Sequence, residues 1–126
     1  MIPMNNGCDC VCSTAPKLIF SCSGAADVGG LADLAARTLN REGVGKMFCL
    51  AGIGGRVSGI LKTTETASSI LAIDGCPLDC AKKSLEEAGF TAFNHLRLAD
   101  MGMEKGKTEI SAETIAQVVD KAKSLL

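Results

Sequence analysis

The sequence predicts an α/β fold, in which a mostly parallel four-stranded sheet carries helices on both faces in three layers, as in Rossmann-like and flavodoxin-like domains. Two observations lead to this prediction. Four short runs that are apolar almost throughout alternate with four segments of helical periodicity. Each run is followed by a turn that is rich in glycine or contains aspartate. Strands that alternate with helices are joined by right-handed crossovers into a parallel sheet.

The four expected strands have the length and apolarity of strands that are covered on both faces, although the fourth is more polar. They are KLIFSC, KMFCLA, SILAID and TAFNHLRLA, at residues 17–22, 46–51, 69–74 and 91–99. We expect the strand order 2-1-3-4. This order opens a crevice between the first and third strands, where open α/β sheets bind ligands.

The first two helices are predicted from apolar residues at helical spacing. The first begins near Asp27, which suits an N-cap, and ends at Gly43. Its expected apolar face is Val28, Leu31, Leu34, Ala35 and Leu39. The second helix, at residues 57–67, has a weaker pattern.

The last two helices have clearer end signals. Pro77 suits the first position of the third helix and Gly89 suits its C-terminal cap. The fourth helix has Ser111 as its expected cap, and Lys121 and Lys123 lie near the negative end of the helix dipole. The residues expected to face inward are Leu78, Ala81, Leu85 and Ala88 in the third helix, and Ile115, Val118, Val119, Ala122 and Leu126 in the fourth.

The chain is expected to form one domain with a short leading arm. Its 126 residues are enough to bury a core without disulfides. We expect residues 1–15 to be a flexible, cysteine-rich arm and residues 16–126 to be a single α/β metal-binding domain. The arm carries Cys8, Cys10 and Cys12 in alternation, which in an extended chain places their side chains on one side. This spacing suits a soft metal ion and equally suits a tail of reactive thiols.

Composition narrows the partners and the compartment. Lys and Arg number 13 against 14 Asp and Glu, and the four Phe are the only aromatic residues, so nucleic acid is not an expected partner. No run approaches the roughly 18 apolar residues of a membrane span, and the first residues lack a basic leader, so no membrane partner is expected. We therefore expect a cytoplasmic protein. The composition does not indicate a protein partner.

Seven cysteines are unusual in a reducing compartment, where free thiols more often bind metal or catalyse than form disulfides. Cys22 and Cys49 end or nearly end the first two strands, Cys76 follows the third, and Cys80 lies in the first turn of the third helix. All four are expected at the carboxyl edge of the sheet. Four thiolates suit one Zn²⁺, so these are the predicted metal ligands.

The turns around these cysteines suit a site that holds four negatively charged thiolates. Close backbone approach is expected at Gly24, Gly52, Gly54, Gly55 and Gly75, because glycine has no Cβ. Asp74 is expected to shape its turn or to hydrogen-bond to it. Arg56, Lys82 and Lys83 are expected to add positive charge near the four thiolates.

Other interpretations of the same residues stay open. A single cysteine at a strand end is more often a small buried hydrophobe than a ligand. A cysteine-dependent enzyme, such as a thiol redox enzyme, a phosphatase or an arsenate reductase, needs one activated thiol, with Arg56 as its anion contact. Four thiolates also serve an iron–sulfur cluster. His95 is the only histidine, and in a strand its expected role is structural.

The segment IDGCPLDCAKK after the third strand resembles the DGC-motif family, which is described as zinc-binding. The stretches SCSGAADVG, GVGKMFCLAGIGG and DMGMEKGK extend the resemblance from Lys17 to the end of the chain. The resemblance implies a zinc site built from cysteines, carried over onto Cys22, Cys49, Cys76 and Cys80, and a role in metal or metalloid handling. It implies no catalytic activity.

Overall fold

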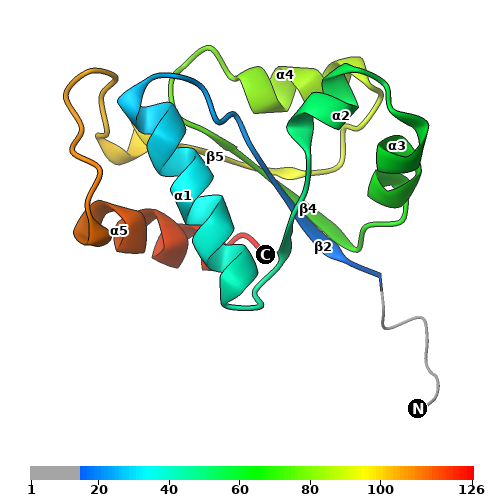
Figure 1. The fold of residues 1–126 in the computed structure, drawn as a ribbon, viewed down its shortest axis with the longest axis horizontal. Helices are drawn as coiled ribbons and strands as arrows, with labels where there is room; N and C mark the ends of the chain where they lie inside the picture. Colours follow the sequence, from blue (N-terminus) through cyan, green and yellow to red (C-terminus); the bar gives the residue numbers. More distant parts are fainter. Residues whose placement is uncertain (1–14) are drawn as a thin grey trace.

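The computed structural model describes residues 15–126, which form a parallel sheet with helices on both of its faces (Figure 1). The arm expected at residues 1–15, with Cys8, Cys10 and Cys12, lies outside the described residues except for Ala15. In chain order the elements are β2 (Lys17–Ser21), α1 (Asp27–Arg41), β3 (Lys46–Met47), α2 (Leu50–Gly54), α3 (Ser58–Glu65), β4 (Ser69–Asp74), α4 (Cys80–Glu87), β5 (Asn94–Arg97), the 3₁₀ turn η2 (Leu98–Met101) and α5 (Ala112–Lys123).

The four strands lie in the order β3-β2-β4-β5, and every neighbouring pair is parallel. This is the predicted order 2-1-3-4, so the α/β fold class and the topology are confirmed. β2 and β4 are the two central strands. The loops that follow them therefore leave the sheet side by side, at the edge where the cysteines were expected.

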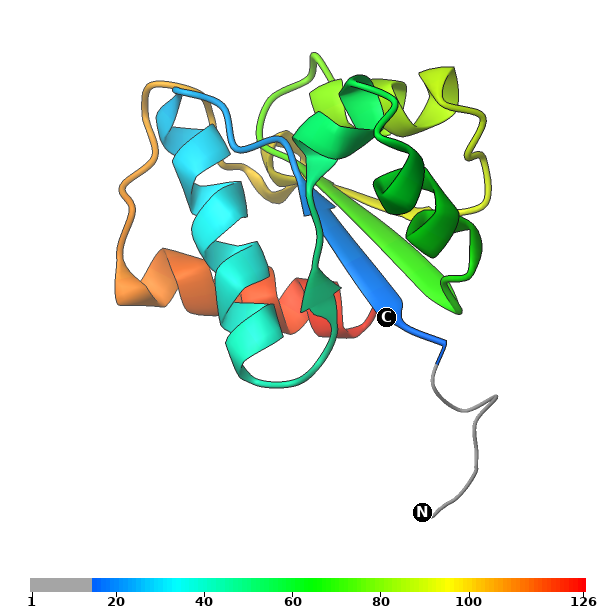
Figure 2. The same cartoon turned by 45° about the vertical axis from the view of Figure 1, so that its right-hand side comes forward.

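The two faces of the sheet bury different helices. Alternate side chains of a strand point to opposite faces. Ile19, Leu71 and Ile73 pack in a core with residues of α1 and α5, whereas Phe20 and Ala72 pack in a second core with residues of α2 and α4. The turned view in Figure 2 shows α1 and α5 on one side of β2 and β4, and α2, α3 and α4 on the other.

The strand register brings the chain segments after β2 and β4 together. Ser21 is paired with Ile73, and the Cys22 N–H donates to the Ile73 carbonyl at 3.0 Å. Asp74, the last residue of β4, is paired with Arg97 at the end of β5. Cys22 and the Asp74-Gly75-Cys76 turn are thus neighbours at the carboxyl edge.

The prediction of a strand at residues 46–51 is wrong beyond the first two residues. β3 ends at Met47, Cys49 is the N-cap of α2, and the start of the expected glycine loop is helical. Gly52 allows this turn of helix to lie close to α3, because a Cβ there would be 2.7 Å from Ile60 Cγ1. Packing against Ile60 thus places helix where glycine content alone indicated a loop.

The third helix also begins later than predicted. Asp79 has a left-handed backbone with φ 58°, so α4 starts at Cys80 and not at Pro77. Leu78, expected in the apolar stripe, is 62% exposed. Leu34 of α1, also expected on an apolar face, is 39% exposed. The expected fourth strand is trimmed to β5, and the turn η2 replaces its last residues.

The last helix follows the prediction closely. The Ser111 side chain accepts from the Thr114 N–H at 3.2 Å, and the Thr114 hydroxyl accepts from the Ser111 N–H at 2.9 Å. This reciprocal capping box fixes the start of α5. Val118, Val119 and Ala122 are buried against the α1 side of the sheet, as expected. Within residues 15–126 no helix has the length and apolarity needed to cross a membrane.

Candidate functional site

Cys22 follows β2 directly and lies between the two central strands. Its sulfur accepts a hydrogen bond from the Gly75 backbone N–H, with 3.4 Å between Sγ and N. The side chain is half-buried and touches both hydrophobic cores. Cys22 is therefore held at the carboxyl edge next to the turn that carries Cys76.

Cys49 reaches the same edge from the neighbouring strand. The Phe48 N–H donates to the Ile19 carbonyl at 2.9 Å, which continues the β3 pairing to the residue before Cys49. The Cys49 carbonyl accepts from the Gly52 N–H at 3.1 Å and so starts α2. Its side chain is exposed. Cys22 and Cys49 line one open pocket of about 1080 Å³.

Cys76 and Cys80 flank the turn that joins β4 to α4. Cys76 is half-buried against the α1 side of the sheet, and its carbonyl accepts from the Asp79 N–H at 3.4 Å. Cys80 is the exposed first residue of α4. We call Cys22, Cys49, Cys76 and Cys80 the thiol edge. All four are free thiols that come from the ends of three adjacent strands.

The sulfurs of the thiol edge are near one edge of the sheet but are not gathered to a point. Within residues 15–126, no three of them lie within 4.8 Å of one another. Zinc–sulfur bonds are about 2.3 Å long, so sulfurs that share one ion lie roughly 4 Å apart. The donor set suits zinc, since it offers four thiols and no competing disulfide. The loops would have to draw these thiols together around an ion.

Asp74, the first residue of the Asp-Gly-Cys motif, has a different role from the cysteines. Its carboxylate is only 1% exposed and accepts from the Ala81 N–H at 2.7 Å and the Lys82 N–H at 3.1 Å. These are among the N–H groups that the start of a helix leaves unpaired. Asp74 therefore caps α4 from the end of β4, six residues before the helix begins. Asp74 thus bonds to the first turn of α4, just beyond the turn that it was expected to shape.

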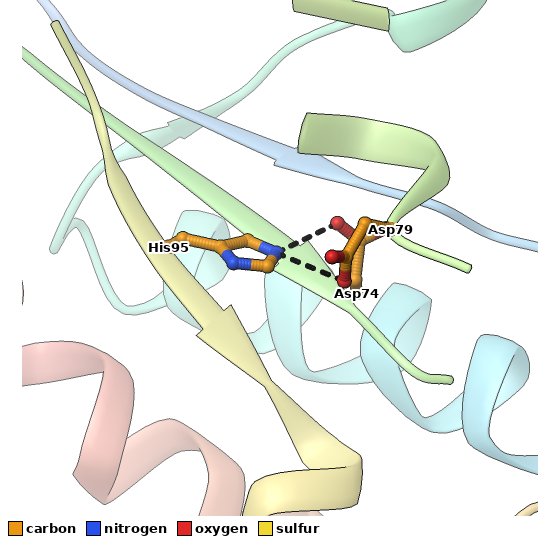
Figure 3. Close-up of side chains that lie close together, drawn as sticks. All are labelled: Asp74, Asp79 and His95. Carbon is orange, nitrogen blue, oxygen red and sulfur yellow. Dashed lines mark hydrogen bonds and ion pairs between the residues drawn. The ribbon is translucent and has the colours of Figure 1, made fainter. Parts of the chain in front are cut away.

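Three further side chains complete a polar cluster around the buried Asp74. His95 Nε2 lies 2.8 Å from Asp74 Oδ2 and 3.8 Å from Asp79 Oδ1. Figure 3 shows the His95 ring pointing toward the two carboxylates. Arg97 donates from Nε and Nη2 to the two oxygens of Asp79 at 2.8 and 2.6 Å. These bonds hold the pKa of Asp79 below its ordinary value, although burial acts in the opposite direction. We call Asp74, Asp79, His95 and Arg97 the acid–histidine network.

The acid–histidine network has the residue types of a cation site, but each of its carboxylate oxygens already accepts a hydrogen bond. One ligand atom from each of Asp74, Asp79 and His95 lies within 4.8 Å of the others. Both oxygens of Asp74 already accept backbone N–H groups, and both oxygens of Asp79 accept from Arg97. The cluster therefore joins β4, β5 and α4, which agrees with the structural role expected for His95.

The glycines expected to allow close approach fall into two groups. A Cβ on Gly75 would lie 2.7 Å from the backbone C and O of Val28, and one on Gly52 would meet Ile60. Gly24 and Gly54 face open space, and a Cβ on Gly55 would be 3.3 Å from a backbone oxygen. Gly75 thus lets the motif turn pack on the start of α1. The role of the five as contacts to a bound group stays a prediction.

Arg56 does not have the place expected for an anion contact. Its guanidinium donates to the carbonyls of Ile53 at 2.8 Å, Gly54 at 3.3 Å and Glu87 at 3.1 Å. The positive charge therefore satisfies the C-terminal ends of α2 and α4 and ties these helices together. This corrects the interpretation of Arg56 as a clamp on a phosphate or oxyanion.

Sequence reasoning missed the charged wall of the pocket beside Cys22 and Cys49. Asp33, Arg37 and Arg41 of α1 line this pocket and are spaced four residues apart, so they form one stripe along the helix. That spacing is visible in the sequence. Its position opposite two of the cysteines is not, because it depends on how α1 packs beside β3.

The comparisons with known proteins cover the same part of the chain. The model of the DGC domain family matches residues 18–122, which include the whole thiol edge. The Anaerobic and virulence modulator AnvM of Pseudomonas aeruginosa (strain PAO1) is 38% identical over 88 residues, which cover 70% of this chain and 67% of that protein. No solved structure matches the chain.

Proposed function

Because this chain belongs to the DGC domain family, for which a zinc site of cysteines was expected, we propose that it binds Zn²⁺ through Cys22, Cys49, Cys76 and Cys80. The observation that supports this most is the arrangement of the thiol edge. Four free thiols from three adjacent strands occupy the carboxyl edge of one sheet, where α/β folds bind ligands. Structural zinc sites with four cysteines are closed and tetrahedral.

One backbone donor already lies beside the proposed zinc ligands. Zinc binds thiolate, and four thiolates with one Zn²⁺ carry a net charge of about −2. The Gly75 N–H already points at Cys22 Sγ, and backbone donors of this kind offset such charge. The buried Asp74 fixes the start of α4, and with it the backbone position of Cys80. The chain thus supplies one oriented thiol and a rigid support for another.

Zinc would order the edge that holds it. The ion would draw Cys49 and Cys80, both exposed, toward the half-buried Cys22 and Cys76. Because the unfolded chain has no such site, metal binding adds to folding stability. A protein whose loop structure depends on bound metal and on reduced thiols suits regulation. The printed name of the P. aeruginosa relative, an anaerobic and virulence modulator, is consistent with such a role.

The test is metal content, measured by elemental analysis on the full chain purified reduced, without a metal-binding tag. We expect about one zinc per chain and a sharp loss of zinc in Cys76→Ser, since three thiols hold the ion much less tightly than four. Ser124→Ala, at the C-terminal end of α5, is the control and should leave the zinc content unchanged. Full zinc in Cys76→Ser, or iron with sulfide in place of zinc, would contradict the proposal.

A further inference from the structure

The pocket beside Cys22 and Cys49 has features that zinc binding does not use. It holds about 1080 Å³ and opens between α1, the end of β2 and the start of α2. This volume is ample for a small molecule. Met47, Phe48 and Leu50 give it an apolar wall. A bound molecule would therefore have an uncharged part of modest size in addition to any group that meets the charged wall.

The charged wall of the pocket is positive on balance. Two guanidiniums, Arg37 and Arg41, face one carboxylate, Asp33. Both oxygens of Asp33 are in use, since one accepts from Arg37 Nε at 2.6 Å and the other from the Ser23 hydroxyl at 2.7 Å. Arg41 makes no ion pair within residues 15–126, and Arg37 is 62% exposed. The free edges of two guanidiniums suit carboxylates, which arginine binds in a fork.

The position of the Arg37 and Arg41 wall is fixed by its neighbours. Asn40, between the two arginines, accepts the Met47 N–H through its side-chain oxygen at 2.8 Å. This bond fastens α1 to β3, the strand that leads to Cys49. The backbone that carries the two arginines is therefore tied to the strand before Cys49.

The two thiols in the pocket differ in access. Cys22 is half-buried, and its sulfur already holds the Gly75 N–H. Cys49 is exposed. Thiol–disulfide exchange requires a thiolate that can reach the sulfur it attacks. Cys49 is therefore the thiol in the pocket that a bound molecule can meet directly.

We propose that this pocket binds a low-molecular-weight disulfide that carries carboxylates, and that Cys49 takes up half of it by exchange. The carboxylates lie on Arg37 and Arg41. The Cys49 thiolate, having lost its proton to water, attacks one ligand sulfur. A bond forms between Cys49 Sγ and that sulfur, the ligand disulfide bond breaks, and the other half leaves as a thiolate that takes a proton from water. Cys49 is oxidised and the ligand disulfide is reduced.

The exchange goes beyond zinc binding and does not depend on it. Zinc at the thiol edge would compete for Cys49, so the two reactions are alternatives at one sulfur. Failure of zinc binding would leave the exchange intact, and failure of the exchange would leave zinc binding intact. A carboxylate-bearing disulfide would thus report oxidising conditions at the same cysteine that the metal uses.

The experiment measures adduct formation at each cysteine of the reduced, chelator-treated full chain by mass spectrometry of its peptides. Oxidised glutathione is the carboxylate-bearing probe, and cystamine, which carries only ammonium groups, is the opposite probe. In Arg37→Gln/Arg41→Gln we expect the glutathione rate at Cys49 to fall about three- to tenfold at low ionic strength, and the cystamine rate to stay equal or rise. Cys80, outside the pocket, should keep its rates.

Two further variants separate pocket binding from net charge and from misfolding. Lys62→Gln/Lys105→Gln removes two exposed charges elsewhere and should leave the glutathione rate at Cys49 unchanged. Arg41→Gln alone removes the charge of a residue that has no ion pair in the described part of the chain. The logarithm of the glutathione rate at Cys49 should then fall by about half as much as in the double variant. Equal slowing of both probes, no slowing in either arginine variant, or glutathione only at cysteines other than Cys49 would overturn the proposal.

Discussion

Residues 74–80 contribute to two neighbouring groups that differ in how completely their polar atoms are bonded. Asp74 and Asp79 belong to the acid–histidine network, where each carboxylate oxygen has a donor within 3.1 Å. Cys76 and Cys80 belong to the thiol edge, where the one hydrogen bond to a sulfur in the described residues reaches Cys22. The difference suggests that the acidic residues hold the turn in place and that the cysteines are left free for a ligand.

Backbone conformation shows the same division. Ser23, next to Cys22, and Asp79, next to Cys80, both have positive φ, which costs a residue with a side chain about 1 kcal/mol or more. Asp79 is held there by Arg97, and Ser23 bonds to Asp33 through its hydroxyl. The chain thus bends sharply beside two of the cysteines, and side chains outside the thiol edge stabilise the bends.

We expect the largest change in stability when the Asp74 carboxylate is removed. Asp74→Ala leaves the Ala81 and Lys82 N–H groups and the His95 ring without their acceptor, so we expect the free energy of unfolding to fall by about 2 to 4 kcal/mol. Urea unfolding measures it. Asp120→Ala, on the exposed side of α5, is the control and should change stability by less than about 0.5 kcal/mol. Equal stability of the two variants would mean that the network does not hold α4.

A smaller loss of stability is expected at Gly75, which lies between Asp74 of the acid–histidine network and Cys76 of the thiol edge. Gly75→Ala puts a Cβ 2.7 Å from the Val28 backbone, and that backbone must move, so we expect a loss of about 1 to 3 kcal/mol in the free energy of unfolding. Gly54→Ala, where the added Cβ meets nothing within 4 Å, is the matched control and should be neutral or slightly stabilising. Thermal unfolding of both variants compares them directly. A neutral Gly75→Ala would show that the motif turn is not packed on α1.

The smallest expected effect depends on pH. Arg97 holds the pKa of Asp79 below its ordinary value of 3.8, so folding favours the ionised carboxylate. The stability it contributes is present above the ordinary value and is lost as the pH falls through the lowered pKa. Arg97→Gln should therefore be less stable than the parent near neutral pH, and the gap should narrow below about pH 4.

Urea unfolding across this range of pH measures the gap, with Asp100→Asn as the control. That change removes the weaker 3.5 Å partner of Arg97 and leaves Asp79 paired. A gap for Arg97→Gln that stays constant as the pH falls would show that the Asp79–Arg97 pair does not contribute through ionisation.

The sequence predicted the sheet well and the network poorly, for physical reasons. β2 and β4 are apolar on both faces, and α5 has a capping box, so local patterns determined their place. The KMFCLA run is also apolar after its first residue, but its last residues belong to α2. A helix of five residues has too little periodicity to be recognised. The partners of Asp74 come from residues 81, 82 and 95, so only the folded chain reveals them.

The predicted strands place the four cysteines at the carboxyl edge of the sheet. The distances between their sulfurs cannot be derived from the sequence. Parallel strands end at one edge, and this fixed the neighbourhood of Cys22 and Cys76. The departure of Cys49 into α2 and the exposure of Cys80 depend on how the helices pack. The role of Arg56 was missed for the same reason, because its acceptor on Glu87 lies on another helix.

The most direct test of the zinc proposal is X-ray absorption at the zinc edge on the loaded full chain. We predict a first shell of about four sulfur neighbours near 2.3 Å, because four thiolates close a tetrahedral site. The number should fall by about one in Cys76→Ser, with an oxygen or nitrogen neighbour in its place. A shell dominated by nitrogen and oxygen in the parent chain would contradict the account, because the zinc would then lie away from the thiol edge.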